Sequence, residues 1–232
     1  MATFVMRMWL PDRPGALGAV ASRIGAVRGD VVGIDILERD GGQAVDELVV
    51  ELPDGEDLVD LLISEVRQVD GVAVEEIRPV SDALHDPRLD CLEAAAQLVG
   101  ATDVDELLTA TVIHGRRVIG ASWAAVVSLE PPEGDAEGTL VADADAPDRG
   151  WLEAFLSGSR AADGSPRPAD EGGTADVIWA PLPSSGLALV LGRDEMAYRA
   201  RERRQVAALA RVVDTRLREL IRMKSRARHP SR

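Results

Sequence analysis

The first eighty residues alternate between the hydrophobic pattern of a strand and that of a helix. Thr3 to Leu10 places apolar side chains on one face with a period of two, which predicts a half-buried strand. Pro11 to Gly15 ends this strand, since proline and glycine interrupt regular structure. From Leu17 to Val27 apolar residues recur every three or four positions, as on the buried face of an amphipathic helix.

A β-hairpin, a second helix and a last strand are predicted next. Asp40-Gly41-Gly42 is typical of a tight hairpin turn. The resulting order, βαββαβ, is that of a ferredoxin-like sandwich in residues 1–80. The three strands are expected at Val31–Leu37, Ala44–Leu52 and Val72–Arg78, and the helix from Asp54 to Val69.

Two helices cover one face of such a sheet and leave the other face to a partner. Arg7 and Trp9 alternate onto that second face. We therefore expect the sheet face near Trp9 to contact another subunit or domain.

The pattern changes after residues 81–87, which are polar and predicted to be a linker. Residues 88–222 form a second predicted domain with two helices at its start and a long helix from about Met196 to Arg222 at its end. Strands are expected at Ser122–Leu129, Gly138–Ala142, Asp176–Leu182 and Leu187–Gly192, with a helix at Asp148–Ser157. The apolar stripe of the last helix is Val206, Leu209, Val213, Leu217 and Leu220.

Composition narrows the class of protein. Of 232 residues 46% are hydrophobic but only 3% are aromatic, so the cores must consist mainly of aliphatic side chains. No apolar run approaches the roughly 20 residues of a membrane span, and no signal peptide is recognisable. We therefore expect a cytoplasmic protein without a membrane partner.

Charge is distributed unevenly. The net charge of -14 excludes a whole-protein role in coating nucleic acid or an anionic membrane. Residues 199–232, however, carry 12 basic and 3 acidic side chains, including a basic C-terminal tail predicted at 223–232. This segment either complements the helix macrodipole and the acidic domains, or contacts an acidic protein partner or nucleic acid. Of the two contacts we expect the protein partner rather than nucleic acid, because no aromatic interleaving is present and no helix-turn-helix precedes the tail. Its candidate contact residues are Arg203, Arg204, Arg222, Lys224, Arg226 and Arg228.

Signals for catalysis are poor. His85, His114 and His229 are far apart and form no metal-binding pair, and His114 is expected at the surface near a helix end. The only cysteine, Cys91, excludes an internal disulfide and is expected to be a small buried thiol. The Ser184-Ser185-Gly186 turn lacks the flanking pattern of a hydrolase nucleophile. We expect no enzyme activity, no metal and no cofactor.

The segment Asp12-Arg13-Pro14-Gly15-Ala16-Leu17 resembles the D/N-x-P-G-x-L motif of the ACT domain, an amino-acid-sensing module of many enzymes of amino-acid metabolism. The resemblance spans about residues 3–80 and includes the element order. The second domain resembles a GAF-type sensor domain at Ala180-Pro181-Leu182, at Leu187–Gly192 and along the Val206–Leu217 helix. The implied fold class is α+β, with a ferredoxin-like ACT-like sandwich followed by a GAF-like α/β/α domain and its long terminal helix.

The ACT-like loop is the first candidate binding site. Pro14 and Gly15 turn the backbone sharply and leave the early N–H groups of the first helix directed outward, where the carboxylate of an amino acid would be well placed. Asp12 can accept a hydrogen bond from the ammonium group of the ligand. Alternatively, the segment is only a loop and a helix N-cap. The resemblance implies a site between two such domains, with Asp12, Gly15, Ala16 and Leu17 on the loop side and Asp30, Val31 and Val32 on the partner side.

A second candidate pocket lies in the GAF-like domain. Trp123, Trp151 and Trp179 either line a small-molecule cavity or belong to the core. Arg193, after the last strand, meets either an anionic ligand or solvent.

These features indicate a non-catalytic small-molecule sensor. We expect a homodimer that binds an amino acid or a related metabolite at an ACT–ACT interface and acts through a partner or an assembly change. The sheet face near Trp9 and the stripe of the last helix are the expected dimer surfaces. The alternative is a ligand-free interaction scaffold that uses the dimeric domains and the basic C-terminal helix.

Overall fold

The chain forms two compact units in a computed structural model. The first unit comprises Met1–Asp86 with Arg199–Arg201, and the second comprises Pro87–Tyr198 with Glu202–Arg232. Several predicted features lie outside the described residues, namely the helix start at Asp54, the linker up to residue 86, His85 and His229. The structure describes residues 2–53, 58–80, 87–129, 140–161, 176–194 and 196–228.

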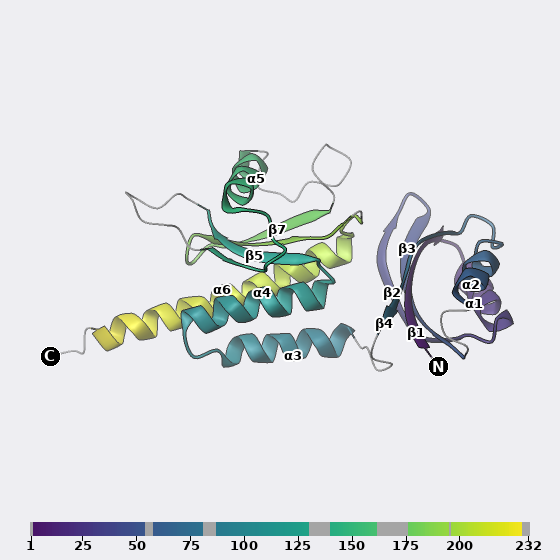
Figure 1. Ribbon diagram of the computed structural model, residues 1–232, viewed down its shortest axis with the longest axis horizontal. Coiled ribbons are helices and arrows are strands. Elements are labelled where there is room, and N and C mark those ends of the chain that lie inside the picture. The colour runs from purple at the N-terminus through teal and green to yellow at the C-terminus, as the bar shows by residue number, and fades with distance from the viewer. Residues whose placement is uncertain are drawn as a thin grey trace. The chain divides into compact units, whose positions relative to one another are not determined.

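The first unit is a ferredoxin-like sandwich, as its element order predicted. Its strands lie in the order β2-β3-β1-β4, and every neighbouring pair is antiparallel. Helices α1 and α2 lie on one side of the sheet (Figure 1). The elements are β1 (Ala2–Pro11), α1 (Ala16–Ala26), β2 (Asp30–Asp40), β3 (Gln43–Leu52), α2 (Val59–Val66) and β4 (Ala73–Val80).

The core of the first unit lies between the sheet and these two helices. Alternate residues of β1 and β3 point into it because successive side chains of a strand face opposite sides. The glycine-rich turn between β2 and β3 is tight, since Gly41 and Gly42 have φ values of 56° and 81°. The buried strand residues are Phe4, Met6, Met8, Leu10, Ala44, Leu48, Val50 and Leu52.

The edge strand β2 leaves an apolar row exposed. Val32, Ile34 and Ile36 have exposed fractions of 47%, 44% and 39%. Ile34 and Ile36 lie opposite Leu48 and Asp46, on the helix side of the sheet, but remain uncovered, and Val32 lies at a register shift between them and the start of β2. The pairing with β3 also shifts by one residue at two places in β2, as at β-bulges. An open, apolar edge of this kind favours pairing with another strand.

The second unit is a three-layer α/β/α arrangement. Its sheet has the strand order β6-β5-β8-β7 and is antiparallel throughout. Helices α4 and α6 lie on one face of the sheet, with α3 beyond α4, and α5 lies on the other face (Figure 1). The elements are α3 (Pro87–Gly100), α4 (Val104–Ile119), β5 (Trp123–Ser128), β6 (Leu140–Ala142), α5 (Arg149–Ala161), β7 (Val177–Leu182), β8 (Leu187–Gly192) and α6 (Ala200–Arg228).

The central strands β5 and β8 are buried on both faces. Val126 and Leu189 belong to the core shared with the long helices, whereas Val127 and Val190 face α5. This double burial explains why both strands are continuously apolar in sequence.

Helix α6 differs from its prediction in two respects. The stripe from Val206 to Leu220 lies inside the core of the second unit, so it is not a surface for a second copy. The sequence pattern correctly identified an apolar face but could not show that the chain's own sheet covers it. The helix also continues to Arg228, past the predicted end at Arg222. Among the described residues, no helix combines the length and the apolar character needed to cross a membrane.

Candidate functional site

The loop between β1 and α1 is held against the β2–β3 turn. The Asp12 N–H donates a hydrogen bond to the Gly42 carbonyl oxygen at 2.9 Å. The Asp12 carboxylate lies 3.8 Å from the Arg39 guanidinium near the end of β2, and both side chains are largely exposed. This end of the sheet therefore brings together the predicted ligand loop and a cation.

Helix α1 begins without a side-chain cap in the described structure. Gly15 occupies the N-cap position with φ 87° and ψ -13°, and the first turn contains no acidic residue. A left-handed conformation of this kind favours glycine over any residue with a side chain. The Asp12 segment is therefore a loop but does not cap the helix through a side chain. The first-turn N–H groups and the positive end of the helix dipole favour an anion here.

Asp46 is the residue that the sequence reasoning missed. It lies on β3 opposite Met8 and Ile36, on the side of the sheet that faces the helices. Only 4% of the residue is exposed, and within the described structure its Oδ1 atom has no hydrogen-bond partner. Burial raises the pKa of this carboxyl, against the effect of the Arg39 guanidinium and with a smaller contribution from Asp12. Asp46, Arg39 and Asp12 are thus close enough to interact electrostatically.

The sequence did contain a signal for Asp46. In the strand predicted at Ala44–Leu52, every second residue from Ala44 onward is apolar except Asp46. An acid at an inward position of a strand is unusual, because an ionised carboxylate is costly to bury. Such a position suggests either a buried partner or a binding role.

Substitution of Asp46 tests its electrostatic state. Asp46→Asn is expected to raise the free energy of unfolding near neutral pH by about 1 kcal/mol, because it removes a buried charge at nearly constant size. A carboxyl whose pKa is raised by folding stabilises the folded state when it is protonated. The advantage of the variant should therefore shrink as the pH falls toward 3.8, the ordinary value for Asp. Urea denaturation of the wild type and of Asp46→Asn, from neutral pH down to this value, measures the difference in their free energies of unfolding. A variant less stable than the wild type at neutral pH would contradict the interpretation.

The predicted site residues fall at opposite ends of the sheet in one chain. Asp12 and Gly15 lie at the end where β2 meets β3, while Asp30 lies opposite Glu51 at the other end. The two ends of β2 are roughly 30 Å apart at about 3.3 Å per residue. The side chain of Ala16 is buried in the core, so only its backbone is available to a ligand. A single copy therefore does not assemble the predicted set Asp12, Gly15, Ala16, Leu17, Asp30, Val31 and Val32.

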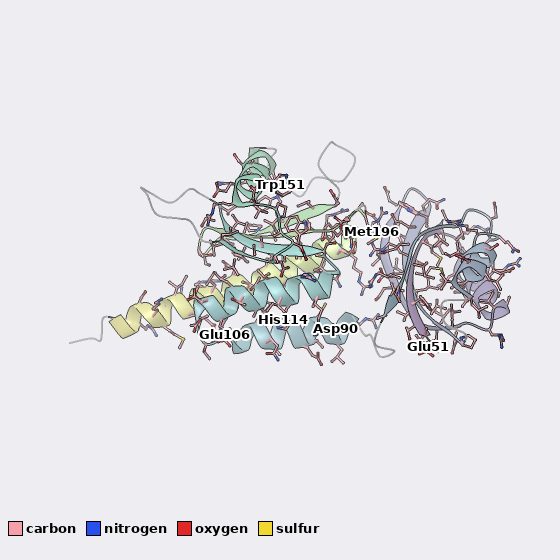
Figure 2. All side chains as sticks on the ribbon, in the orientation of Figure 1. Glu51, Asp90, Glu106, His114, Trp151 and Met196 are labelled. Carbon is pink, nitrogen blue, oxygen red and sulfur yellow. The ribbon has the colours of Figure 1, made fainter. Side chains whose placement is uncertain are left out.

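The tryptophans of the second unit form an aromatic cluster on the α5 side of the sheet. The rings of Trp123 and Trp151 are edge-to-face at 6.1 Å, and Trp151 stacks on Phe155 at 5.4 Å. Trp179 packs against the same cluster. Figure 2 shows Trp151 on α5. Trp123 is buried and Trp179 is partly buried, which favours the core interpretation for these two, whereas Trp151 is 40% exposed.

Arg193 is buried and paired with a carboxylate of the same chain, so the expectation that it meets solvent is wrong. Its guanidinium donates to the two carboxylate oxygens of Glu202 at 2.7 and 3.0 Å, and both side chains are buried. It also lies over the ring of Tyr198, with its central carbon 4.0 Å from the ring centroid. Arg193 is therefore a structural residue of the second unit.

The other candidates for chemistry are dispersed. His114 on α4 (Figure 2) is half-buried and not at the surface as expected, and burial beside Arg117 lowers its pKa. Cys91 is half-buried, less than predicted, because Ala94 and Leu98 supply the inward face of α3. In the described part of the chain, no group of three or more His, Cys, Asp or Glu side chains is placed to hold a metal ion.

No family model and no curated protein matches the chain. Solved structures similar to it include the ACT domain of GTP pyrophosphokinase from Chlorobium tepidum, at 16% identity over 34% of this chain and 100% of that chain, with a TM-score of 0.28. A formyltetrahydrofolate deformylase from Pseudomonas putida matches at 17% identity over 42% of this chain and 38% of its own, with a TM-score of 0.28. An unknown protein from Galdieria sulphuraria matches at 14% identity over 69% of this chain and 90% of its own, also at 0.28. We assign the ferredoxin-like fold from the strand order and connections of the first unit itself.

Proposed function

We propose that this protein is a non-catalytic small-molecule sensor. Its first unit binds an amino acid or a related metabolite carrying a carboxylate, at an interface between two copies of the chain. Ligand binding then stabilises one assembly state or one partner-binding state through differential affinity. The second unit is GAF-like in this proposal and has no assigned ligand.

The observation that carries this proposal is the start of α1 without a side-chain cap, at the same end of the sheet as a buried carboxylate whose Oδ1 atom has no hydrogen-bond partner in the described structure. The helix start at Gly15 offers N–H donors to an anion, and the Asp12 loop leads directly into it. Asp46 supplies an acceptor within electrostatic reach of that loop. A folded unit with a helix start that lacks a side-chain cap and with a buried acceptor atom is suited to a ligand that supplies an acceptor and a donor.

The exposed edge of β2 supports a site shared by two copies. If two β2 strands pair antiparallel about Ile34, Val32 of one copy lies opposite Ile36 of the other, and both apolar rows are covered. This pairing also brings the start of β2 in one copy toward the Asp12 loop of the other. The two halves of the predicted site would then meet.

Thermal-shift screening of the full chain tests the proposal. We expect at least one standard amino acid at millimolar concentration to raise the melting temperature, because a ligand that binds only the folded state stabilises it by mass action. Light scattering should show a dimer, and Ile34→Lys should remove both the dimer and the shift. Ile113→Lys, at an exposed position of α4, serves as the matched control and should change neither.

Two results would contradict the proposal. A protein that is dimeric but whose melting temperature no amino acid raises would favour the alternative, a ligand-free interaction scaffold. A shift that survives unchanged in monomeric Ile34→Lys would place the ligand outside the dimer interface.

The scaffold remains a second candidate because of one specific surface. Residues 221–226 at the end of α6 are all exposed, including Met223 at 60%. Arg222, Lys224 and Arg226 surround this apolar side chain in sequence. We propose that, if no small molecule binds, this basic end of the helix contacts an acidic protein partner.

A further inference from the structure

We infer that Asp46 is the residue that selects the ligand, by accepting a hydrogen bond from a protonated amine. The inference rests on the proposed function and narrows it: the ligand is a zwitterionic amino acid, and carboxylates that lack the amine are discriminated against. Asp46 is separate from the loop motif that led to the predicted site.

Asp46 is buried on the helix-facing side of the sheet. Among the inward-facing positions of β3, it is the only one with a charged side chain, and its neighbours Ala44 and Leu48 belong to the core. A buried carboxylate is normally paired or hydrogen-bonded, because losing its hydration is costly. The Oδ1 atom has no such partner in the described structure. A donor supplied by a ligand would satisfy it.

The charged groups around Asp46 do not balance one another. The charged groups that act on Asp46 are Arg39 at the end of β2 and Asp12 in the loop before α1. The Arg39 guanidinium is 3.8 Å from Asp12, and the two side chains are 57% and 41% exposed. Such an exposed pair is weak and leaves two carboxylates with a single cation. The site is therefore short of one positive charge, which a protonated amine carries.

The start of α1 and Ile36 account for the rest of the ligand. Pro11, which leads into the loop before α1, pairs with Gln43, three residues before Asp46 on β3. The anion-favouring helix start and the buried carboxylate therefore belong to one end of the unit. A molecule that carries both a carboxylate and a protonated amine matches this pair of groups. Ile36, opposite Asp46 and exposed, offers apolar contact to the remainder of the molecule.

Calorimetric titration of the full chain with paired probes tests the inference. Each standard amino acid is compared with its α-hydroxy acid counterpart, in which a neutral hydroxyl replaces the ammonium group. We expect the wild type to bind at least one amino acid about tenfold or more tightly than its counterpart, the usual size of a hydrogen bond to a charged group. Asp46→Asn should weaken the binding of the amino acid by a similar factor and leave the affinity for the hydroxy acid unchanged.

Asp60→Asn is the matched control. It makes the same chemical change in the same unit, at an exposed position in the first turn of α2. We expect it to leave both affinities unchanged. The preference of the wild type for amine over hydroxyl needs no variant, so it tests the inference even if Asp46→Asn fails to fold.

The possible failures are distinguishable. If the wild type binds an amino acid and Asp46→Asn binds it equally well, Asp46 is not the acceptor, while the proposed sensor function stands. If the hydroxy acid binds as tightly as the amino acid, selection of the amine is wrong and the sensor again stands. If the folded wild type binds neither probe, both the proposed function and this inference are overturned.

Discussion

Replacing Glu202 with Gln is expected to lower the free energy of unfolding of the second unit by about 3–5 kcal/mol. The substitution leaves the Arg193 guanidinium buried without its counter-ion, and both side chains of the pair are less than a tenth exposed. Arg193 also donates to the backbone carbonyl oxygens of Met196 and Ala197 at 2.8 and 2.6 Å. The pair therefore connects the end of β8 to the first turn of α6, and its loss should destabilise both.

Urea denaturation followed by tryptophan fluorescence measures this effect. Three of the four tryptophans, Trp123, Trp151 and Trp179, belong to the second unit, so the signal reports mainly on its unfolding. Glu219→Gln on the same helix is the control, because the Glu219 side chain is 55% exposed and its partner Arg216 also donates to the Ala101 carbonyl oxygen, which the change leaves in place. We expect that control to cost about 0.5 kcal/mol or less. Equal losses of unfolding free energy in the two variants would show that the buried Arg193–Glu202 pair stabilises the unit no more than an exposed pair does.

The first unit could be predicted well from sequence because its signals are local. The turn at Asp40-Gly41-Gly42 requires positive φ values that glycine readily adopts, and the structure has them at Gly41 and Gly42. The strand order then follows from the connections, since few arrangements of βαββαβ keep crossovers right-handed. The start of α4 in the second unit is also a local signal: Asp is a preferred N-cap residue, and the Asp103 side chain accepts a hydrogen bond from the Glu106 N–H.

What could not be predicted depends on contacts between distant parts of the chain. The apolar stripe of α6 has the helical period, but the period does not distinguish a dimer face from a core face. The role of Arg193 depends on Glu202, nine residues away on another element. At the candidate site, the loop motif identified Asp12 and Gly15, whereas Asp46 comes near them only through the pairing of β3 with β1. A charged residue at an inward strand position is the sequence signal that would have found it.

Gly192→Ala is expected to be the other strongly destabilising change, costing about 3 kcal/mol or more. Gly192 pairs with Trp123 across β8 and β5, and a Cβ atom there would lie 2.2 Å from the indole ring. The ring belongs to a packed cluster and contacts Trp151 edge-to-face, so it cannot move without losing those contacts. The glycine is required for space, because its φ lies outside the left-handed region.

Thermal denaturation of Gly192→Ala and of Gly158→Ala tests this expectation. The first variant adds a methyl group where the Trp123 ring already lies, and the second adds one where there is open space. Gly158 lies in α5 with nothing within 4 Å of an added Cβ, so the second change should stabilise the helix by about 0.5–1 kcal/mol. Trp123→Leu shortens the side chain that occupies the space beside Gly192. The double variant should lose less unfolding free energy than the sum of the losses in the two single variants, because the added methyl group partly fills the space that the ring leaves. Additive losses would show that the indole of Trp123 is not what requires glycine at this position.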